Sequence, residues 1–316
     1  MEPGSSHRRA VLAGLAALGF ARPSVGQDAE PDPLLSLYER LPLFTNLTTR
    51  IGAAVVLNGR KRRTFVIDTG AERSVLAQDV ADALELDEGP EVTVHGVTSA
   101  ARTPTARLDR LAIGGRTFRD LHLPIIPRAA LAADGLLGLD VLSHFRLELE
   151  LADRRMALTP SDGSGFRGYE GFATPTRLNR PDAGRARKGR FGQLILTDGL
   201  VDDTPVRAFI DTGAQYSIGN SQLETALGRS SRDTATTVRL HGVTGQSLVV
   251  RPGSPRAVRL ARQTLEGAPL LFGDLHAFDI LDLNAGPALL LGADILYRFR
   301  RVTLDYGRGR LALALR

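Results

Sequence analysis

The sequence repeats itself, and this internal duplication constrains the fold more than any other feature. Three short blocks recur in the same order and at similar spacings in the two halves of the 316-residue chain. The matching segments are 65–75 and 208–218, 95–98 and 241–244, and 136–145 and 290–299. Repeats in this arrangement predict two homologous units, which a pseudo-twofold axis can relate.

Each half has the pattern of a mainly β unit with two short helices. An apolar hairpin precedes the first block of each copy, and we expect its turn at Asn58-Gly59 and at Asp198-Gly199, respectively. Helical spacing follows at Val80, Ala83 and Leu84, and again at Leu223, Ala226 and Leu227. Alternating strands come next, one of them over 108–113, and each half closes with a short helix and a terminal hairpin.

The chain divides into five predicted segments. They are a signal peptide over 1–27, an N-terminal segment over 28–47, a first repeat over 48–160, a linker over 161–192 and a second repeat over 193–316. The linker is rich in Gly, Pro and Arg and has little apolar periodicity, which indicates an exposed connection. Its charge run at 185–190 is interpreted as solvated, with a processing site or an anion contact as alternatives.

The N-terminus has the three parts of a bacterial export signal. Arg8-Arg9 precede an apolar run over 10–20, and a tail of small residues ends near Gln27. The twin arginine resembles a Tat-type signal, and Sec export is the alternative. The pattern predicts a periplasmic or secreted protein. The apolar run is too short to span a bilayer comfortably and no later run is long enough, so we expect no stable membrane insertion.

Composition excludes several kinds of site. The chain has no cysteine, which rules out disulfides, thiolate metal sites and cysteine nucleophiles. Arginine supplies almost all of the positive charge behind the net +5, and a GC-rich genome explains this excess most simply. A module that binds anionic envelope polymers is an alternative that rests on arginine content alone. No basic run is interleaved with aromatic residues, so nucleic-acid binding is not expected.

The duplicated Asp-Thr-Gly-Ala turns carry the predicted chemistry. Asp68 and Asp211 each follow an apolar strand, so each carboxyl should lie at the edge of a core, facing its counterpart. Two carboxyls about 3 Å apart share one proton. The ionised one can take a proton from water while the protonated one polarises a carbonyl. This chemistry requires neither a metal nor a cofactor, and none is predicted.

Neighbouring residues have predicted supporting roles. The hydroxyls of Thr69 and Thr212 should hold the opposing turns together, and Gly70 and Gly213 should leave backbone amides free to bond the carboxylates. The small glycine after each later Leu-Leu pair should allow the backbone to approach closely beneath the turn.

These motifs resemble those of the retropepsin-like aspartic proteases. The shared features are Ile-Asp-Thr-Gly-Ala with a later Ser, a Gly-Val segment, and Gly-Leu-Leu-Gly-Leu-Asp-Val-Leu, and the likeness covers about 48–158 and 194–315. The resemblance implies two closed acid-protease-type β lobes with a cleft between them and an extended polypeptide as substrate. It also implies flaps, which we assign to His95, Gly96 and Val97 and to His241, Gly242 and Val243.

The fused arrangement predicts a monomer whose two halves pair within one chain. A homodimer that exchanges halves through the linker is the alternative. The predicted activity is that of an aspartic endopeptidase acting on a limited set of exported or envelope proteins. A non-catalytic peptide-binding pseudoprotease of the same fold is the second hypothesis.

The sequence departs from the family pattern beside the turns. Ala71 and Ala214 stand where many pepsins have a hydroxyl that stabilises the ionised pair, so activity should extend toward neutral pH. Glu72 and Gln215, at equivalent positions, differ, and this predicts an asymmetric substrate preference. The arginine that retroviral enzymes place after the late glycine is absent, so Glu72 must find another partner.

The remaining polar residues have structural interpretations. A metal pair at His95 and His241 is less favoured than two surface hairpin positions, because neither has a second ligand nearby in the sequence. The carboxylates of Asp140 and Asp294 should interact favourably with the dipole of the short helix that starts at each of them. Ser74 and Ser217 should either cap the following helical segment or support the turn, since no His-Asp pair marks them as nucleophiles.

Overall fold

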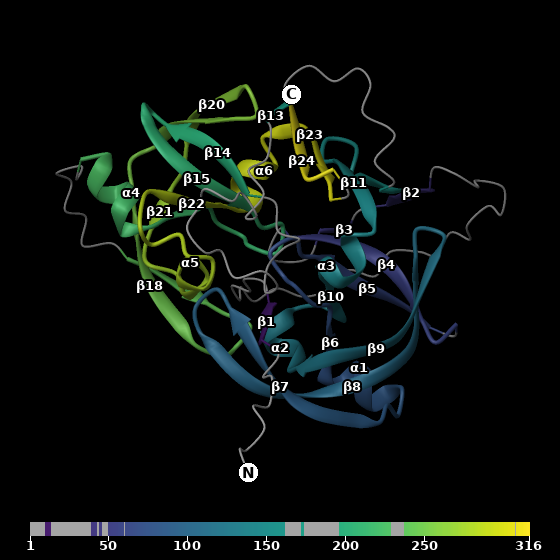
Figure 1. The fold of residues 1–316 in the computed structure, drawn as a ribbon. Helices are drawn as coiled ribbons and strands as arrows, with labels where there is room; N and C mark the ends of the chain where they lie inside the picture. Colours follow the sequence, from purple (N-terminus) through teal and green to yellow (C-terminus); the bar gives the residue numbers. More distant parts are fainter. Residues whose placement is uncertain are drawn as a thin grey trace, which may run out of the picture.

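The computed structural model describes residues 10–13, 39–42, 44–45, 50–59, 61–161, 172–173, 196–228, 237–306 and 308–316. The predicted signal peptide, N-terminal segment and linker lie largely outside these residues. Two β-rich lobes contain the rest of the chain (Figure 1). None of the helices in the described ranges is long and apolar enough to span a membrane.

The first lobe is a nine-stranded sheet with short helices. Its elements are β1 (Ala10–Ala13), β3 (Phe44–Thr45), β4 (Ile51–Leu57), β5 (Lys61–Ile67), β6 (Val75–Ala77), α1 (Gln78–Ala83), β7 (Glu88–Gly96), β8 (Ala100–Ile113), β9 (Arg116–Ile126), α2 (Arg128–Leu131), β10 (Gly135–Leu137) and α3 (Leu139–Leu142). The strand order is β1-β7-β8-β9-β6-β10-β5-β4-β3. An additional pairing of β4 with β8 closes the six strands from β8 to β4 into a barrel.

The second lobe repeats this plan with a different outline. Its elements are β14 (Leu196–Val201), β15 (Thr204–Ile210), β16 (Ile218–Gly219), α4 (Ser221–Ala226), β17 (Val238–His241), β18 (Ser247–Pro252), β19 (Arg256–Leu260), β20 (Gln263–Ala268), β21 (Leu271–Phe272), α5 (His276–Ile280), β22 (Ala288–Leu291) and α6 (Ala293–Leu296). Its strand order is β17-β18-β21-β16-β22-β15-β14-β19-β20.

Two breaks distinguish the second lobe from the first. The long strand β8 of the first lobe corresponds to the consecutive strands β18 and β19. The long strand β9 corresponds to the consecutive strands β20 and β21. Pro255 lies in the first break and Pro269 in the second. Proline lacks the amide that a ladder requires, so strands end or bend where it occurs.

The hairpin turn predicted at Asp198-Gly199 is wrong. Both residues lie inside β14, and the turn falls at Asp202-Asp203, where Asp202 adopts a φ of 49°. The Asp202 carboxylate accepts a hydrogen bond from the Ala257 amide (3.0 Å), which stabilises this conformation. Gly199 is needed in the strand because a methyl group there would lie 2.7 Å from the carbonyl oxygen of Arg259. The corresponding turn at Asn58-Gly59 is confirmed, with Asn58 at a φ of 49°.

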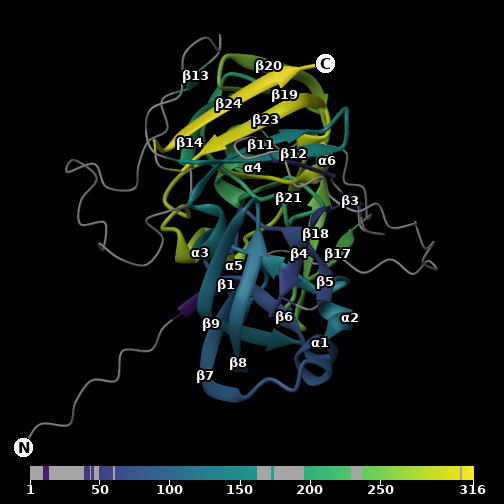
Figure 2. The same ribbon diagram turned by 90° about the vertical axis from the view of Figure 1, so that its right-hand side faces the viewer.

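A third sheet joins the two repeats. It contains β2 (Glu39–Pro42), β11 (Phe145–Glu150), β12 (Arg155–Pro160), β13 (Phe172–Ala173), β23 (Phe299–Asp305) and β24 (Arg310–Leu315) in the order β13-β24-β23-β11-β12-β2. The two predicted terminal hairpins lie side by side in it, because β11 of the first repeat pairs antiparallel with β23 of the second. Figure 2 shows these strands as one layer above the first lobe.

Aliphatic side chains fill the interior of both lobes. One continuous cluster of buried apolar residues runs through the first lobe, the joining sheet and part of the second lobe. A smaller cluster lies mainly in the second lobe, with Val97 of the first repeat, and includes Phe209 and Phe278, whose rings meet edge to face. The joining sheet and the shared cluster make the two repeats one packed body, which fixes the position of one turn against the other.

Candidate active site

The two Asp turns occupy equivalent places in the fold. Asp68 follows β5 and Asp211 follows β15, and each strand pairs in parallel with the strand of the later Leu-Leu block. The backbone amide of Asp68 donates to the carbonyl of Leu137 (2.9 Å), and that of Asp211 donates to the carbonyl of Leu291 (3.0 Å). Both aspartates are buried, with exposed fractions of 0% and 1%. The chain therefore delivers two carboxyls from strand ends into the interior.

The threonines hydrogen-bond the turns to each other across the repeats. Thr69 donates its hydroxyl to the carbonyl of Ile210 (2.8 Å), and Thr212 donates its own to the carbonyl of Ile67 (2.5 Å). Each hydroxyl also accepts from the backbone amide of the opposite threonine, at 3.1 and 3.2 Å. These four reciprocal bonds fix the separation of the turns.

The glycines bring the carboxyls face to face. The amide of Gly70 donates to Asp68 Oδ1 (3.0 Å), and the amide of Gly213 donates to Asp211 Oδ1 (2.9 Å). A methyl group on Gly70 would lie 2.6 Å from Asp211 Cγ, and one on Gly213 would lie 2.5 Å from Asp68 Cγ. Each carboxyl thus rests against the glycine of the other turn, where only the absence of a Cβ leaves room for it.

Burial raises the pKa of both carboxyls, but not equally. Burial is the main cause for Asp68, whose pKa rises to about 6, while Arg50 and backbone hydrogen bonds oppose the rise. The pKa of Asp211 lies well above its usual range because of burial first and the neighbouring Asp68 second. The pair therefore keeps one proton near neutral pH, with Asp68 as the carboxyl that ionises first.

Two further ionisable residues interact electrostatically with the pair, and the sequence patterns did not single them out. Arg50 precedes β4 and is completely buried, and burial lowers its pKa to about 10, against the opposing effect of the two aspartates. Tyr306 follows β23, and its pKa is raised by burial and then by the charges of both aspartates. Arg50 precedes an apolar strand in the sequence. Because arginine is usually exposed, the pattern gives no reason to place this side chain in the protein interior.

The two predicted flap segments meet each other. Ser99 Oγ lies 2.7 Å from Thr244 Oγ1, and Thr98 donates its hydroxyl to the carbonyl of Gln246 (3.3 Å). Gly96, Val97, Gly242 and Val243 are all buried. A methyl group on Gly96 would lie 3.1 Å from Thr244 Cγ2. The contact therefore joins one repeat to the other.

The prediction of two surface histidines is right for one and wrong for the other. His241 is exposed at the end of β17, whereas His95 is half-buried and its Nδ1 lies 2.9 Å from Nε2 of His276 in α5. The two rings stack with centroids 5.2 Å apart. Folding brings this pair together from positions 181 residues apart, which no spacing rule could anticipate. The described part of the chain holds no group of three or more potential metal ligands.

The residues directly after each turn serve as backbone acceptors. The carbonyls of Ala71 and Ala214 accept from the first amides of α3 and α6, both at 2.8 Å. The carbonyls of Glu72 and Gln215 accept from Asp140 and Asp294, both at 3.1 Å. The two alanines are completely buried, while Glu72 and Gln215 are half-buried.

Each Asp turn is stabilised by a hydrogen-bond network that contains a serine and a later glycine. Ser74 accepts from the amide of Gly138 (3.0 Å) and donates to Asp140 (2.7 Å). The second copy repeats this network with Ser217, Gly292 and Asp294, at 2.9 and 2.6 Å. A methyl group on Gly292 would lie 2.5 Å from the carbonyl oxygen of Tyr216, so the predicted close backbone approach is present. The serines and the later aspartates thus have a structural role.

A comparison with family models decides the relationship. The model described as aspartyl protease matches residues 53–141 and 197–295, which is more than half of the chain, and each match contains one Asp turn. The chain belongs to the aspartyl protease family. No curated protein matches the sequence significantly. Two matches in one chain confirm the predicted fusion of two retropepsin-like repeats and the mainly β aspartyl protease fold.

Proposed function

We propose that this aspartyl protease family member is an active aspartic endopeptidase. The observation that carries the proposal is the pair of buried carboxyls, one from each repeat, that face each other across reciprocal threonine bonds. A pair that shares one proton offers a base and an acid in one place, which is what the hydrolysis of an amide requires.

The proposed mechanism assigns the two roles from the electrostatics. Asp68, as the carboxylate, takes one proton from a water molecule between the carboxyls, and the water oxygen attacks the scissile carbonyl carbon. Asp211, as the acid, donates its proton to the carbonyl oxygen, giving a gem-diol. Asp68 then passes its proton to the leaving nitrogen, and Asp211 takes a proton from one hydroxyl of the diol. The C–N bond breaks to give a carboxylic acid and an amine, and the pair again holds one proton.

The proposed substrate is an extended polypeptide. The segments 95–98 and 241–244 are the proposed flaps, because they come from both repeats and meet each other. The difference between half-buried Glu72 and Gln215 supports unequal preferences on the two sides of the scissile bond. Because of the leader pattern, we place the enzyme in the periplasm or outside the cell, with exported or envelope proteins as its targets.

We further propose that the active species is a monomer. One chain supplies both carboxyls and both strands of the β11–β23 pairing, so no second copy is needed to complete the site. Light scattering should give the mass of one chain. Twice that mass, together with loss of activity on dilution, would favour exchange of halves between two chains.

The test is cleavage of a denatured protein by the purified enzyme, with and without a pepstatin-like inhibitor. Hydrolysis that the inhibitor suppresses supports the proposal. If the enzyme binds unfolded peptides but releases no new termini at any pH between 3 and 9, the peptide-binding pseudoprotease is the better account.

A further inference from the structure

A buried cation lies close enough to the carboxyl pair to interact electrostatically with it. Arg50 has no exposed surface, and the charges of Asp68 and Asp211 are the interactions that oppose the effect of burial on its pKa. Removing a guanidinium from water is costly unless charges and hydrogen bonds compensate. Its Nη2 donates to the backbone carbonyl of Leu131, at the end of α2. Arg50 thus has a fixed acceptor on one side and the charge of the pair as compensation.

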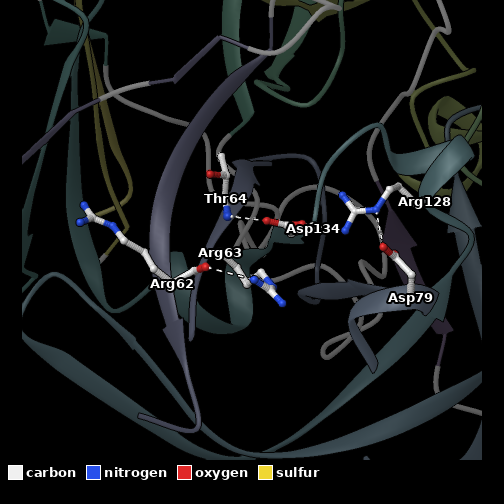
Figure 3. Close-up of polar contacts among 6 residues, drawn as sticks. All are labelled: Arg62, Arg63, Thr64, Asp79, Arg128 and Asp134. Atoms are coloured by element: carbon white, nitrogen blue, oxygen red, sulfur yellow. Dashed lines mark hydrogen bonds and ion pairs between the residues drawn. The ribbon is translucent and has the colours of Figure 1, made fainter. Parts of the chain in front are cut away.

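The acceptor of Arg50 is itself anchored to the strand that carries Asp68. Asp134, just after α2, accepts from the backbone amide of Thr64 in β5 (2.8 Å) and from Arg128 Nη2 (2.7 Å). Arg128 also donates through Nε to Asp79 of α1 (2.7 Å). Figure 3 shows this chain of contacts between β5, α1 and the α2 segment. The segment bearing Leu131 is therefore tied to β5 near the strand end that delivers Asp68.

At the matching sequence position the second repeat has an apolar residue in place of the arginine. Arg50 precedes the positive-φ turn residue Asn58 by eight positions, and the residue eight positions before the matching Asp202 is Leu194. Leu194 lies outside the described residues, but its apolar side chain carries no charge. The two repeats thus match in their Asp turns, threonines and glycines, and differ at the position of Arg50.

We propose that Arg50 is a positioning residue that keeps a negative charge on the carboxyl pair and favours Asp68 as its carrier. This inference rests on the proposed hydrolytic function. A nearby opposite charge stabilises the ionised form of a carboxyl, and a neutral neighbour does not. Within the described part of the chain, Tyr306 also interacts electrostatically with both aspartates, and its raised pKa keeps it a neutral phenol. Among the described residues, Arg50 is therefore the cation that offsets the penalty of burying the charge, together with the backbone hydrogen bonds to Asp68.

The inference predicts how activity responds to pH when the charge is removed. The base form of the pair disappears when Asp68 takes up a second proton. Without the cation this protonation occurs at higher pH, so the acidic limb of kcat/KM should move upward by about one pH unit or more in Arg50→Met and Arg50→Gln. Arg50→Lys keeps the charge and should leave the limb close to its wild-type position. Arg62→Gln removes an exposed charge from the same lobe and serves as the matched control.

A purely structural role for Arg50 predicts a different pattern. In that case kcat/KM falls by the same factor at every pH, and Arg50→Gln, which can still donate to Leu131, retains more activity than Arg50→Lys. This result would overturn the inference. If Arg50→Met does not fold, the comparison of the Lys and Gln variants still decides between charge and hydrogen bond.

A second readout separates this inference from the proposed function. The carboxyl carbons of Asp68 and Asp211 can be titrated by ¹³C NMR in the wild type and in Arg50→Gln, with Asp68→Asn to assign the signals. An upward move of the Asp68 titration in Arg50→Gln supports the inference even if no substrate is cleaved. An unchanged titration refutes it even if the enzyme is active.

Discussion

At the scale of single residues, the site depends on burial that the sequence only partly reveals. The duplicated Asp-Thr-Gly-Ala turn marks Asp68 and Asp211, since each follows an apolar strand in matching repeats. Sequence patterns do not predict the roles of Arg50 and Tyr306, because packing of segments distant in the sequence brings each residue near enough to affect the charge of the pair. The residues that perform the chemistry are therefore visible in the sequence, and the residues that tune their charge are not.

The raised pKa of Asp68 predicts activity near neutral pH. Below a pH of about 6 this carboxyl gains a proton and the pair loses its base, so kcat/KM should fall about tenfold for each pH unit. The pair retains its acid to higher pH, because the pKa of Asp211 is raised well above its ordinary value. A pH profile with one peptide substrate checks this. An optimum confined to pH 3–4 would contradict it.

The same raised pKa values make the site costly for stability. An aspartate whose folded pKa exceeds its unfolded pKa destabilises the fold as the pH rises above the unfolded value, because the unfolded chain releases the proton more readily. Asp211→Asn removes this cost. We expect a gain in unfolding free energy at pH 8, and little change at pH 4, where the unfolded carboxyl is largely protonated as well. Urea unfolding at both pH values measures it, and equal effects at both would contradict the assignment.

At the scale of elements, the two copies obey one plan with local exceptions. The helices α1, α3, α4 and α6 and the terminal hairpins lie where the sequence predicts them, because amphipathic spacing and turn residues act locally. The short helices α2 and α5 are additional to the two predicted for each half. The second hairpin turn was misplaced because Asp-Gly usually forms a turn, whereas here Gly199 pairs inside β14 against Leu260. A close contact from a neighbouring strand overrode the local preference.

The threonine bonds between the turns are the element-scale link that can be tested most simply. Thr212→Val removes the hydroxyl that donates to Ile67 and accepts from Thr69, and leaves two buried backbone groups without these bonds. We expect a loss of about 2–4 kcal/mol in unfolding free energy. Catalytic activity should fall as well, since the carboxyl separation relaxes. Thr117→Val, at an exposed position of β9, is the matched control and should change neither.

At the scale of the whole molecule, the two repeats form one body through contacts that no local pattern encodes. The pairing of β11 with β23, the contact of His95 with His276 and the contact of Ser99 with Thr244 all join residues from different repeats. The duplication predicts that two units face each other about a pseudo-twofold axis. It does not predict which edges meet, because that depends on side chains packing across the axis.

The measurement that tests the central claim most directly is the rate of peptide hydrolysis by Asp68→Asn and by Asp211→Asn, each compared with the wild type at neutral pH. An exposed carboxyl on β8 provides the control variant Asp109→Asn. If the two carboxyls act as one site, each single variant should lose a factor of about 10² to 10⁴ in kcat while remaining folded, and the control should lose nothing. A variant of either aspartate that keeps wild-type activity would contradict the account.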